Sequence, residues 1–328
     1  MAEQKLLSVI IPVYNAARWL DECLQSILVS VHPDETQMIL VNDGSTDESG
    51  KICDRYGTEY SFIRVFHKEN AGVASARNLG LEHAQGLYTA WVDPDDRVSP
   101  DWFNRILGAT QQGQPDVIVM DSVRFDAGAE EKEIYGRTPG FIDRDLFEED
   151  LMRDIRMLSG LPNKVIKTKF FEGVTFDASL QVLEDFAAMP QILKNVQTVY
   201  YLPHCLYFYR QHPASLLHIQ SPERAFQSVQ TAYMREQNAL PRFRPAAITA
   251  TALQALYFCR NTYLQDAFSP KKEQVDFCVS YVRKHLRQLC RDQELPGHLK
   301  AKMMLLAANC YAPFVGLRSR KQQKREER

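Results

Sequence analysis

The N-terminal third of the chain alternates short, nearly continuous apolar runs with longer amphipathic stretches. The apolar runs are rich in β-branched residues, as are strands that are buried on both faces. They span residues 7–13, 38–42, 62–66, 88–92 and 117–123. The amphipathic stretches span residues 19–28, 46–56, 73–84 and 101–111. Such alternation predicts an α/β fold with a mostly parallel sheet and helices on both of its faces.

The pattern changes in the second half of the chain. Residues 127–140 are polar and rich in turn formers, which predicts an exposed loop or lid. The elements expected after this loop are a helix over 144–157, a short strand over 164–166, a helix from about 183, and strands over 198–202 and 206–210. From residue 222 the pattern is helical almost throughout. We therefore expect one domain over residues 1–221 and a smaller, all-helical region over residues 222–328.

The charge differs between these two parts. Residues 1–221 hold 20 Lys and Arg against 32 Asp and Glu, a net charge of −12, whereas residues 222–328 hold 19 against 9, a net charge of +10. The tail "RSRKQQKREER" is the most basic segment. This asymmetry favours an anionic partner for the C-terminal part, such as a membrane surface, a nucleic acid or another subunit. The alternative is that the tail is simply solvated.

Cysteine usage and hydropathy limit the class of protein. The seven cysteines are scattered and form no CxxC motif, which fits reduced thiols in a cytosol better than disulfides or a zinc site. No signal peptide is recognisable. The apolar run Met303–Leu317 is too short for a spanning helix, and it suits either a membrane interface or a last core helix.

The segment "WVDPDD" brings Asp93, Asp95 and Asp96 together directly after the apolar run 88–92. Ligands of open α/β sheets bind outside the carboxyl ends of the strands. Carboxylates this close repel one another unless a cation lies among them, and Mg²⁺ and Mn²⁺ prefer such oxygen ligands. The segment therefore predicts a divalent metal site. A capped turn before a helix is the alternative, because Asp and Pro are common turn formers.

The turn after the first apolar run excludes one class of ligand site. It reads Pro12–Val13–Tyr14–Asn15, without the glycines of a dinucleotide-binding GxGxxG turn. No GxxxxGK[ST] motif occurs either. A phosphate group at this edge of the sheet would need another positive partner, and a metal ion on aspartates would supply it.

Four motifs occur in a fixed order: "SVIIPVYN", "VNDGSTDES", "NAGVASARNLGLEHAQG" and "WVDPDD". Together they resemble family 2 glycosyltransferases, which are inverting enzymes with a GT-A fold. The resemblance continues through "NKVIKTKFF", "LEDFAAMPQIL" and "YLPHCLYFYRQHPASL", as in capsule- and lipopolysaccharide-type bacterial members. It covers roughly residues 6–218, while residues 222–328 resemble nothing that we can name.

The resemblance implies a nucleotide-sugar site in the first three motifs. Pro12, Tyr14 and Asn15 correspond to the loop that lines the nucleotide pocket. Asp43 corresponds to the acid that accepts a hydrogen bond from the uracil N–H, which favours a UDP-sugar.

The third motif contributes Asn70, Gly72 and Arg77. Arg77 is expected near the diphosphate, because a guanidinium fork suits phosphate oxygens, and a structural pair with an aspartate is the alternative. Gly72 is expected to serve close backbone packing.

The same resemblance assigns the metal site. Asp93 is expected at the ribose or at a metal-bound water and Asp95 directly on the metal, whereas the resemblance assigns no separate role to Asp96. In "YFYRQHP", Arg210 and His212 correspond to late residues that reach back to the diphosphate or the metal. A structural histidine is the alternative for His212.

The dipeptide Glu184–Asp185 resembles the family's "ED" motif, in which the aspartate is the catalytic base. Inverting transfer needs one base to take the proton of the acceptor hydroxyl, and it needs no carboxylate nucleophile. An ordinary acidic helix N-terminus is the alternative for this pair.

The resemblance thus implies a glycosyltransferase that depends on Mn²⁺ or Mg²⁺. It would move a sugar from a nucleoside diphosphate, with UDP favoured, to a hydroxyl of a glycan or lipid-linked acceptor. It would act in the cytoplasm or at the inner face of the cell membrane, without a nucleic-acid partner. The alternative is a non-catalytic nucleotide-sugar-binding subunit of a glycan-assembly complex, against which the retention of these acids argues. A sugar-nucleotide pyrophosphorylase would require a glycine-rich loop that "PVYNAA" lacks.

Overall fold

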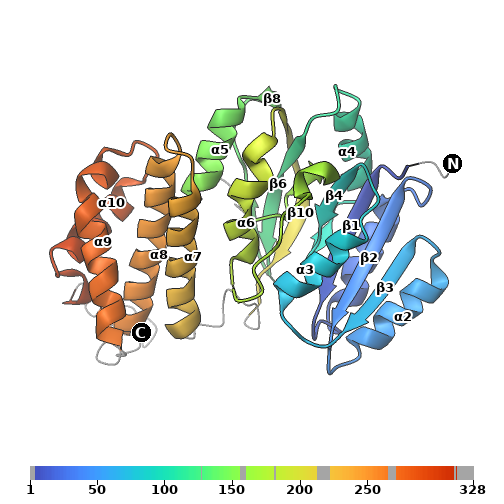
Figure 1. The fold of residues 1–328 in the computed structure, drawn as a ribbon, viewed down its shortest axis with the longest axis horizontal. Helices are drawn as coiled ribbons and strands as arrows, with labels where there is room; N and C mark the ends of the chain where they lie inside the picture. Colours follow the sequence, from blue (N-terminus) through green and yellow to red (C-terminus); the bar gives the residue numbers. More distant parts are fainter. Residues whose placement is uncertain are drawn as a thin grey trace. The chain divides into compact units, whose positions relative to one another are not determined.

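The computed structural model describes residues 4–126, 128–155, 160–180, 182–212, 222–264, 271–313 and 315. The chain divides into two compact units. The first consists of Met1–Leu151 with Arg156–Ser215, and the second of Met152–Ile155 with Leu216–Arg328. A mixed β-sheet with flanking helices forms the first unit, and helices form the second (Figure 1). The expected boundary between residues 221 and 222 adjoins a segment, 213–221, outside the described residues.

Four parallel strands form one half of the sheet. They lie in the order β3-β2-β1-β4 and comprise β1 (Leu7–Val13), β2 (Thr36–Asp43), β3 (Ile63–Lys68) and β4 (Tyr88–Trp91). In register, Leu7 lies opposite both Thr36 and Tyr88. All residues of β1 and β2 are buried, which explains why their sequences are nearly continuous apolar runs.

The other half of the sheet contains antiparallel pairs. Strand β9 (Lys164–Lys167) runs antiparallel between β4 and β6 (Val117–Phe125), and β10 (Val199–Arg210) runs parallel to β6. Three short antiparallel strands complete the sheet: β5 (Arg97–Val98) and β8 (Gly140–Ile142) on β10, and β7 (Glu130–Glu133) on β6.

Helices cover both faces of the parallel half. Successive strand residues point to opposite faces. Alternate β1 residues from Leu7 to Val13 share a core with α1 (Leu20–Ser30), α2 (Ser49–Glu59) and α4 (Trp102–Thr110). Ile10 points to the other face, where Gly80 of α3 (Val73–Glu82) packs closely against it. The predicted α/β fold class is therefore confirmed.

Two local predictions were wrong. The strands expected over 198–202 and 206–210 are the single strand β10, whose register with β6 shifts between Leu202 and Cys205 and again before Tyr207. Pro203 has no backbone N–H to donate, and a strand commonly accommodates a proline at such an irregularity. The loop expected over 127–140 contains β7 and the start of β8.

The described part of the first unit contains four further helical elements. Helix α5 covers Arg144–Arg153 and α6 covers Glu184–Ile192. Short 3₁₀ turns cover Thr168–Phe171 and Leu193–Asn195.

The second unit contains α7 (Pro222–Asn238), α8 (Arg244–Leu264), α9 (Lys272–Arg291) and α10 (Gly297–Ala307). They enclose a separate core, to which the run Met303–Leu317 contributes Met303, Leu306 and Val315. This part of the run therefore packs as a core segment. Within the described ranges, no helix has both the length and the apolar character needed to cross a membrane.

Gly86, between α3 and β4, tests the close packing at the start of the parallel strands. A Cβ atom there would lie 2.4 Å from the backbone N of Ser8 and 2.6 Å from the carbonyl carbon of Leu7. Since backbone atoms cannot move aside cheaply, Gly86→Ala should lower the free energy of unfolding by about 1–3 kcal/mol in urea denaturation.

Gly108→Ala is the matched control for this variant. Gly108 lies inside α4, and a Cβ atom there would meet nothing within 4 Å. Alanine should therefore raise the free energy of unfolding by about 0.5–1 kcal/mol, since glycine weakens a helix interior. Equal stability of the two variants would contradict this account of the packing.

Candidate active site

The carboxyl ends of β1, β2 and β4 meet at one edge of the sheet, because these strands are parallel. The loop after β1 is tied to the loop after β2. The Thr46 amide donates to Asn15 Oδ1 at 2.8 Å, and the Asn15 amide donates to Ser45 Oγ at 3.1 Å. Asn15 has a φ of 48°, a left-handed conformation that Asn tolerates better than most residues. The two loops therefore form one connected surface.

The residues of the first motif differ in accessibility. Tyr14 is 48% exposed, and its side chain is free to meet a ligand. Pro12 is buried within β1, opposite Val41 of β2. Pro12 therefore shapes the start of the loop from within the strand.

Asp43, at the end of β2, organises the loop before α3. Its carboxylate accepts hydrogen bonds from the amides of Ala71 at 3.0 Å and Gly72 at 2.8 Å, and it pairs with Lys68. The side chain is only 3% exposed. Gly72 has a φ of 88° immediately before α3, where a residue with a side chain would be strained. The carboxylate thus fixes the loop that carries the exposed Asn70.

Arg77 is the buried counter-charge of the site. It lies on α3 with 6% of its side chain exposed, and its Nη2 is 3.3 Å from Asp93 Oδ1. Its Nη1 forms an ion pair with Glu184, whose side chain is 5% exposed. One guanidinium therefore joins the turn after β4 to the start of α6. The alternative expected from the sequence, a pair with an aspartate, is present.

Asp96 fastens the acidic turn to β10. Its buried carboxylate accepts the Tyr207 hydroxyl at 2.5 Å and the Arg210 amide at 2.7 Å. The Tyr207 oxygen also accepts the Asp93 amide at 3.2 Å. Burial, together with the charges of Asp95 and Asp93, raises the pKa of Asp96 well above its usual range. Asp96 faces the protein and holds the turn in shape.

Asp95 faces His212 at the end of β10. Its Oδ2 is 2.8 Å from His212 Nε2, and its carbonyl oxygen accepts Arg210 Nε at 2.7 Å. The His212 ring contacts the Trp19 ring, with their centroids 4.1 Å apart, and the buried His212 Nδ1 has no hydrogen-bond partner among the described residues. The histidine is thus held beside Asp95 by an aromatic contact.

The Arg210 guanidinium is used within the protein. It donates to Glu22 at 2.6 Å and lies over the Phe125 ring at 4.5 Å, in addition to its bond to the Asp95 carbonyl. The Arg210 guanidinium is therefore held by the Asp95 carbonyl, Glu22 and Phe125.

Asp93 and Asp95 remain partly accessible, each with 26% of its side chain exposed. Burial raises the pKa of Asp93 to about 6, and the charges of Asp95 and Asp185 act in the same direction while Arg77 opposes them. The pair therefore concentrates negative charge where solvent can reach it. Among the residues that the structure describes, no three His, Cys, Asp or Glu side chains converge as a complete metal site.

Asp185 lies in the first turn of α6. Its Oδ2 accepts the Leu161 amide at 3.0 Å and its Oδ1 accepts the Phe186 amide at 2.7 Å. Leu183 precedes the helix with a φ of 61°, an uncommon conformation for a leucine. Gly160 packs so closely that a Cβ atom there would lie 2.5 Å from Asp185 Oδ2. The carboxylate is thus held in one position beside the Asp93–Arg77 pair.

The structure brings together most of the charged residues expected from the sequence, namely Arg77, Asp93, Asp95, Glu184, Asp185, Arg210 and His212. The sequence analysis missed Trp19, Tyr207 and Glu22. Trp19 lies just before α1, and the only sequence signal was an aromatic residue close behind the first motif. Tyr207 and Glu22 gave no signal, because their partners are distant along the chain.

The comparisons with known proteins agree with one another. A sequence model described as glycosyl transferase family 2 matches residues 8–181. The glycosyltransferase GlyG of Streptococcus pneumoniae is 31% identical over 222 residues, which are 65% of this chain and 73% of GlyG. The uncharacterized glycosyltransferase EpsJ of Bacillus subtilis is also 31% identical, over 65% of this chain and 63% of EpsJ. This chain therefore matches just under two thirds of the length of EpsJ.

Solved structures extend the likeness to the whole fold. The crystal structure of Staphylococcus aureus TarS residues 1–349 in complex with UDP-GlcNAc has a TM-score of 0.66 and 17% identity. The match covers 97% of this chain and 92% of that one. At this identity, the likeness shows a shared fold.

Tyr207→Phe tests the bond that fastens the acidic turn. Phenylalanine keeps the ring but removes the hydroxyl that joins the Asp96 carboxylate to the Asp93 amide. Leaving these buried groups without a partner should lower the free energy of unfolding by about 1–3 kcal/mol in urea denaturation. Tyr257→Phe, at a residue 45% exposed, is the control and should stay within about 0.5 kcal/mol of wild type. A Tyr207→Phe protein as stable as the control would refute this role.

Proposed function

Because the chain belongs to glycosyltransferase family 2, we propose that it transfers a sugar from a UDP-sugar to a hydroxyl group of a glycan or lipid-linked acceptor, with inversion at the anomeric carbon. The TarS structure bound to UDP-GlcNAc supports a UDP-sugar as donor, since it shares this fold. GlyG and EpsJ are glycosyltransferases by name, which supports the same reaction type.

One observation carries the proposal. Arg77 is buried between Asp93 and Glu184, and Asp185 and Asp95 lie close enough to raise the pKa of Asp93. The arrangement gathers the groups that a displacement at an anomeric carbon needs. These are a carboxylate to take a proton and fixed charges near a leaving diphosphate.

The donor nucleotide would bind over the loops after β1 and β2. Tyr14 and Asn15 are exposed there, and Asn70 is exposed in the neighbouring loop. Asp43 already accepts two amides and a lysine, so it retains little capacity for a uracil N–H. Asp43 would then serve the nucleotide mainly by fixing the loop on which Asn70 sits. Pro12 would act by shaping the first loop.

A divalent cation, Mn²⁺ or Mg²⁺, suits the acidic turn. These ions typically take one or two carboxylates from the protein and complete their coordination with phosphate and water. Asp95 and Asp93 would hold it, since both are partly exposed, and the His212 ring beside Asp95 would be a further ligand. When bound, the ion would neutralise charge that develops on the leaving diphosphate.

Asp185 would be the general base. It would take the proton of the acceptor hydroxyl while that oxygen forms a bond to the anomeric carbon. The bond from that carbon to the diphosphate breaks in the same step, and its electron pair leaves with the diphosphate. The amides of Leu161 and Phe186 hold the carboxylate in position, while Glu184 would orient Arg77 through their ion pair.

The charge of the helical unit supports contact with an anionic membrane surface that presents a lipid-linked acceptor. The basic tail from Arg318 lies outside the described residues. Peripheral attachment at the inner face of the cell membrane would follow from such contact.

The alternative function, a non-catalytic nucleotide-sugar-binding subunit, predicts donor binding without sugar-nucleotide hydrolysis or transfer in the presence of Mn²⁺.

The metal assignment predicts the behaviour of Asp95→Ala. This variant should lose Mn²⁺-dependent binding of a UDP-sugar, measured by calorimetry with and without the ion, because a principal ligand is gone. Asp34→Ala, at an exposed aspartate before β2, should bind as wild type does. Equal donor affinity in Asp95→Ala and wild type would show that this aspartate holds no metal.

The base assignment predicts the behaviour of Asp185→Asn. It should transfer sugar at least roughly a hundredfold more slowly, with donor affinity unchanged, because an amide cannot take the proton. Asp177→Asn is a matched control, since Asp177 also accepts a backbone amide, from Ser179. Thermal unfolding would check that the variant is folded. Near-normal turnover in Asp185→Asn, or a product that retains the donor's anomeric configuration, would reject the mechanism.

The membrane proposal predicts the behaviour of a protein lacking residues 318–328. Each basic residue close to an anionic surface contributes about 1 kcal/mol, and this segment has six Lys and Arg against two Glu. The truncated protein should therefore sediment less with phosphatidylglycerol vesicles at low salt than the intact protein does. Neither protein should sediment with neutral vesicles. Absence of binding by the intact protein would dismiss the proposal.

A further inference from the structure

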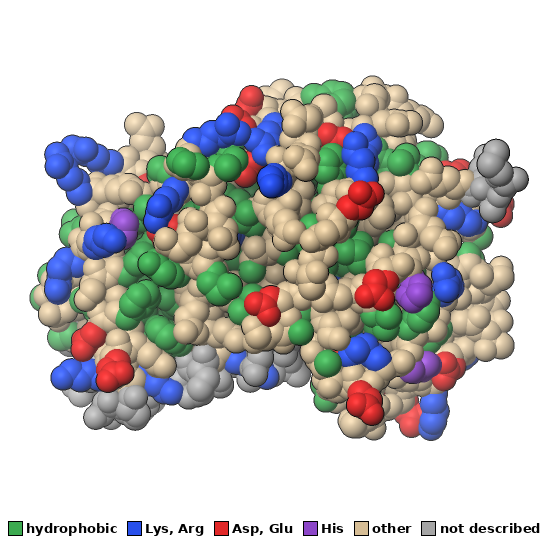
Figure 2. All heavy atoms as spheres, in the orientation of Figure 1, with side chains coloured by type: hydrophobic (Ala, Val, Ile, Leu, Met, Phe, Trp, Pro, Cys, Tyr) green, Lys and Arg blue, Asp and Glu red, His purple; other side chains and the backbone are tan. Residues whose placement is uncertain are grey.

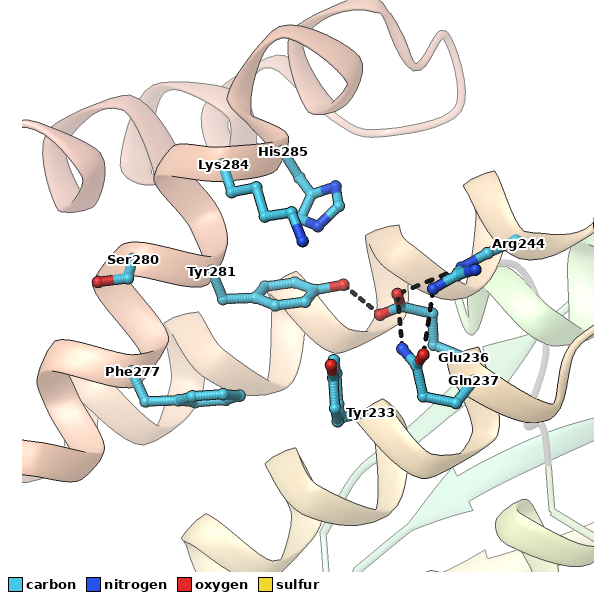
Figure 3. Close-up of a pocket in the computed structure, with 9 residues that line it drawn as sticks. All are labelled: Tyr233, Glu236, Gln237, Arg244, Phe277, Ser280, Tyr281, Lys284 and His285. Carbon is cyan, nitrogen blue, oxygen red and sulfur yellow. Dashed lines mark hydrogen bonds and ion pairs between the residues drawn. The ribbon is translucent and has the colours of Figure 1, made fainter.

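A pocket lies within the helical unit, remote in sequence from the acidic turn. It has a volume of about 240 Å³ and is formed by α7, the start of α8, and α9 (Figure 3). Its lining combines aromatic side chains with charged ones, and six of these carry the argument: Tyr233, Glu236, Arg244, Phe277, Tyr281 and Lys284. None of them takes part in the transfer reaction proposed above.

Three aromatic rings form one side of this pocket. The Tyr233 ring stands perpendicular to Phe277 and to Tyr281, at interplanar angles of 89°, with centroids 5.9 and 6.0 Å apart. Tyr233 is 38% exposed and Phe277 is 39% exposed, so both rings present surface to solvent. Hydrophobic side chains gather over these helices beside basic ones (Figure 2). Exposed aromatic rings in a hollow suit the apolar C–H face of a saturated ring whose edge carries polar groups.

The acid of the pocket is already satisfied. Glu236 is 2% exposed and accepts the Tyr281 hydroxyl, and its Oε1 lies 3.7 Å from Arg244 Nε. The carboxylate therefore fixes the positions of Tyr281 and Arg244 (Figure 3). A cationic ligand is disfavoured, because it would meet Arg244 without an available counter-charge.

Two of the remaining polar groups, Arg244 and Lys284, can only donate, and Arg244 Nη2 also donates to Gln237 Oε1 at 3.1 Å. Lys284 lines the pocket without an ion pair or a side-chain hydrogen bond to any described residue. The neighbouring His285 ring lies 4.8 Å from the Tyr281 ring, and burial, with Lys284 and Arg244 adding to it against Glu236, lowers its pKa. A neutral imidazole beside an ammonium can donate to phosphate oxygens without adding charge. The pocket thus offers an uncompensated positive charge next to an aromatic wall.

We infer that this pocket binds a sugar residue that carries a phosphate group. The aromatic rings would pack against the sugar ring, while Lys284 and Arg244 would hold the phosphate. The volume is below the roughly 300–1,000 Å³ of pockets that enclose drug-sized ligands, so it suits one ring with one charged group. The net charge of +10 over residues 222–328 would attract such an anion. The identification of this ligand as part of the acceptor glycan rests on the proposed function.

Calorimetry on the full chain tests the inference, with glucose 1-phosphate as the probe. Wild type should bind it at least roughly tenfold more tightly than glucose or inorganic phosphate, because only the probe uses both sides of the pocket. Lys284→Gln and Phe277→Ala should each weaken binding by roughly tenfold. Phe277 is partly exposed, so its truncation should leave the fold intact. If the natural ligand is a polymer, a soluble glycan that contains sugar-phosphate units should bind through the same residues.

Two controls locate the binding. Lys272→Gln removes an exposed lysine from the same helix, and Asp95→Ala alters the acidic turn; neither should change affinity for the probe. Loss of probe binding in Asp95→Ala would assign the probe to the donor site and overturn the inference. Equal binding by wild type, Lys284→Gln and Phe277→Ala would also overturn it, as would inorganic phosphate binding as tightly as the probe.

If Lys284→Gln reduced sedimentation with anionic vesicles but not affinity for the probe, the surface would be a membrane contact instead. If the full chain bound the probe but transferred no sugar, this result would reject the proposed function and leave the inference about the pocket intact.

Discussion

Repulsion among crowded carboxylates is the constraint on which the acidic edge of this sheet depends. Asp93, Asp95 and Asp96 follow one strand, and Glu184 and Asp185 approach from the start of α6. The protein compensates these charges unequally. Arg77 pairs with both Asp93 and Glu184, so one positive charge faces two carboxylates, and a tyrosine hydroxyl and a backbone amide satisfy Asp96. Asp93 and Asp95 are partly exposed, and together they leave an excess of negative charge on the solvent side of the turn.

The elements that depend on local pattern could be predicted from the sequence. β1 and β2 are buried along their whole length, so their apolar runs identify them, and helices such as α3 and α4 follow from their amphipathic spacing. The carboxyl ends of parallel strands share an edge whatever the details of packing. For that reason, the position of Asp93 and Asp95 at this edge could be anticipated, whereas Arg77 and Asp185 lie on helices and were placed beside them only through the family resemblance.

The partners of individual side chains could not be predicted, because they depend on contacts between distant residues. Asp43 bonds to amides 28 and 29 residues later, and Asp96 bonds to Tyr207, 111 residues later. Trp19 and His212 meet through the fold alone. The continuity of β10 across Pro203 had the same cause, since its pairing with β6 overrides the local preference of proline for a break. Sequence pattern locates charged groups at an edge, whereas tertiary contacts decide which of them remain free.

The bonds that join the acidic turn to the end of β10 also bear on synthesis of the chain. Asp96 is translated long before Tyr207, Arg210 and His212, the residues that hold the turn in place. A nascent chain can pair β1, β2, β3 and β4 early, but its acidic turn lacks these partners until residue 212 has left the ribosome. The order of synthesis thus makes completion of the site one of the last events in folding the first unit. A chain that ends before β10 has the four parallel strands of this unit without its finished acidic turn.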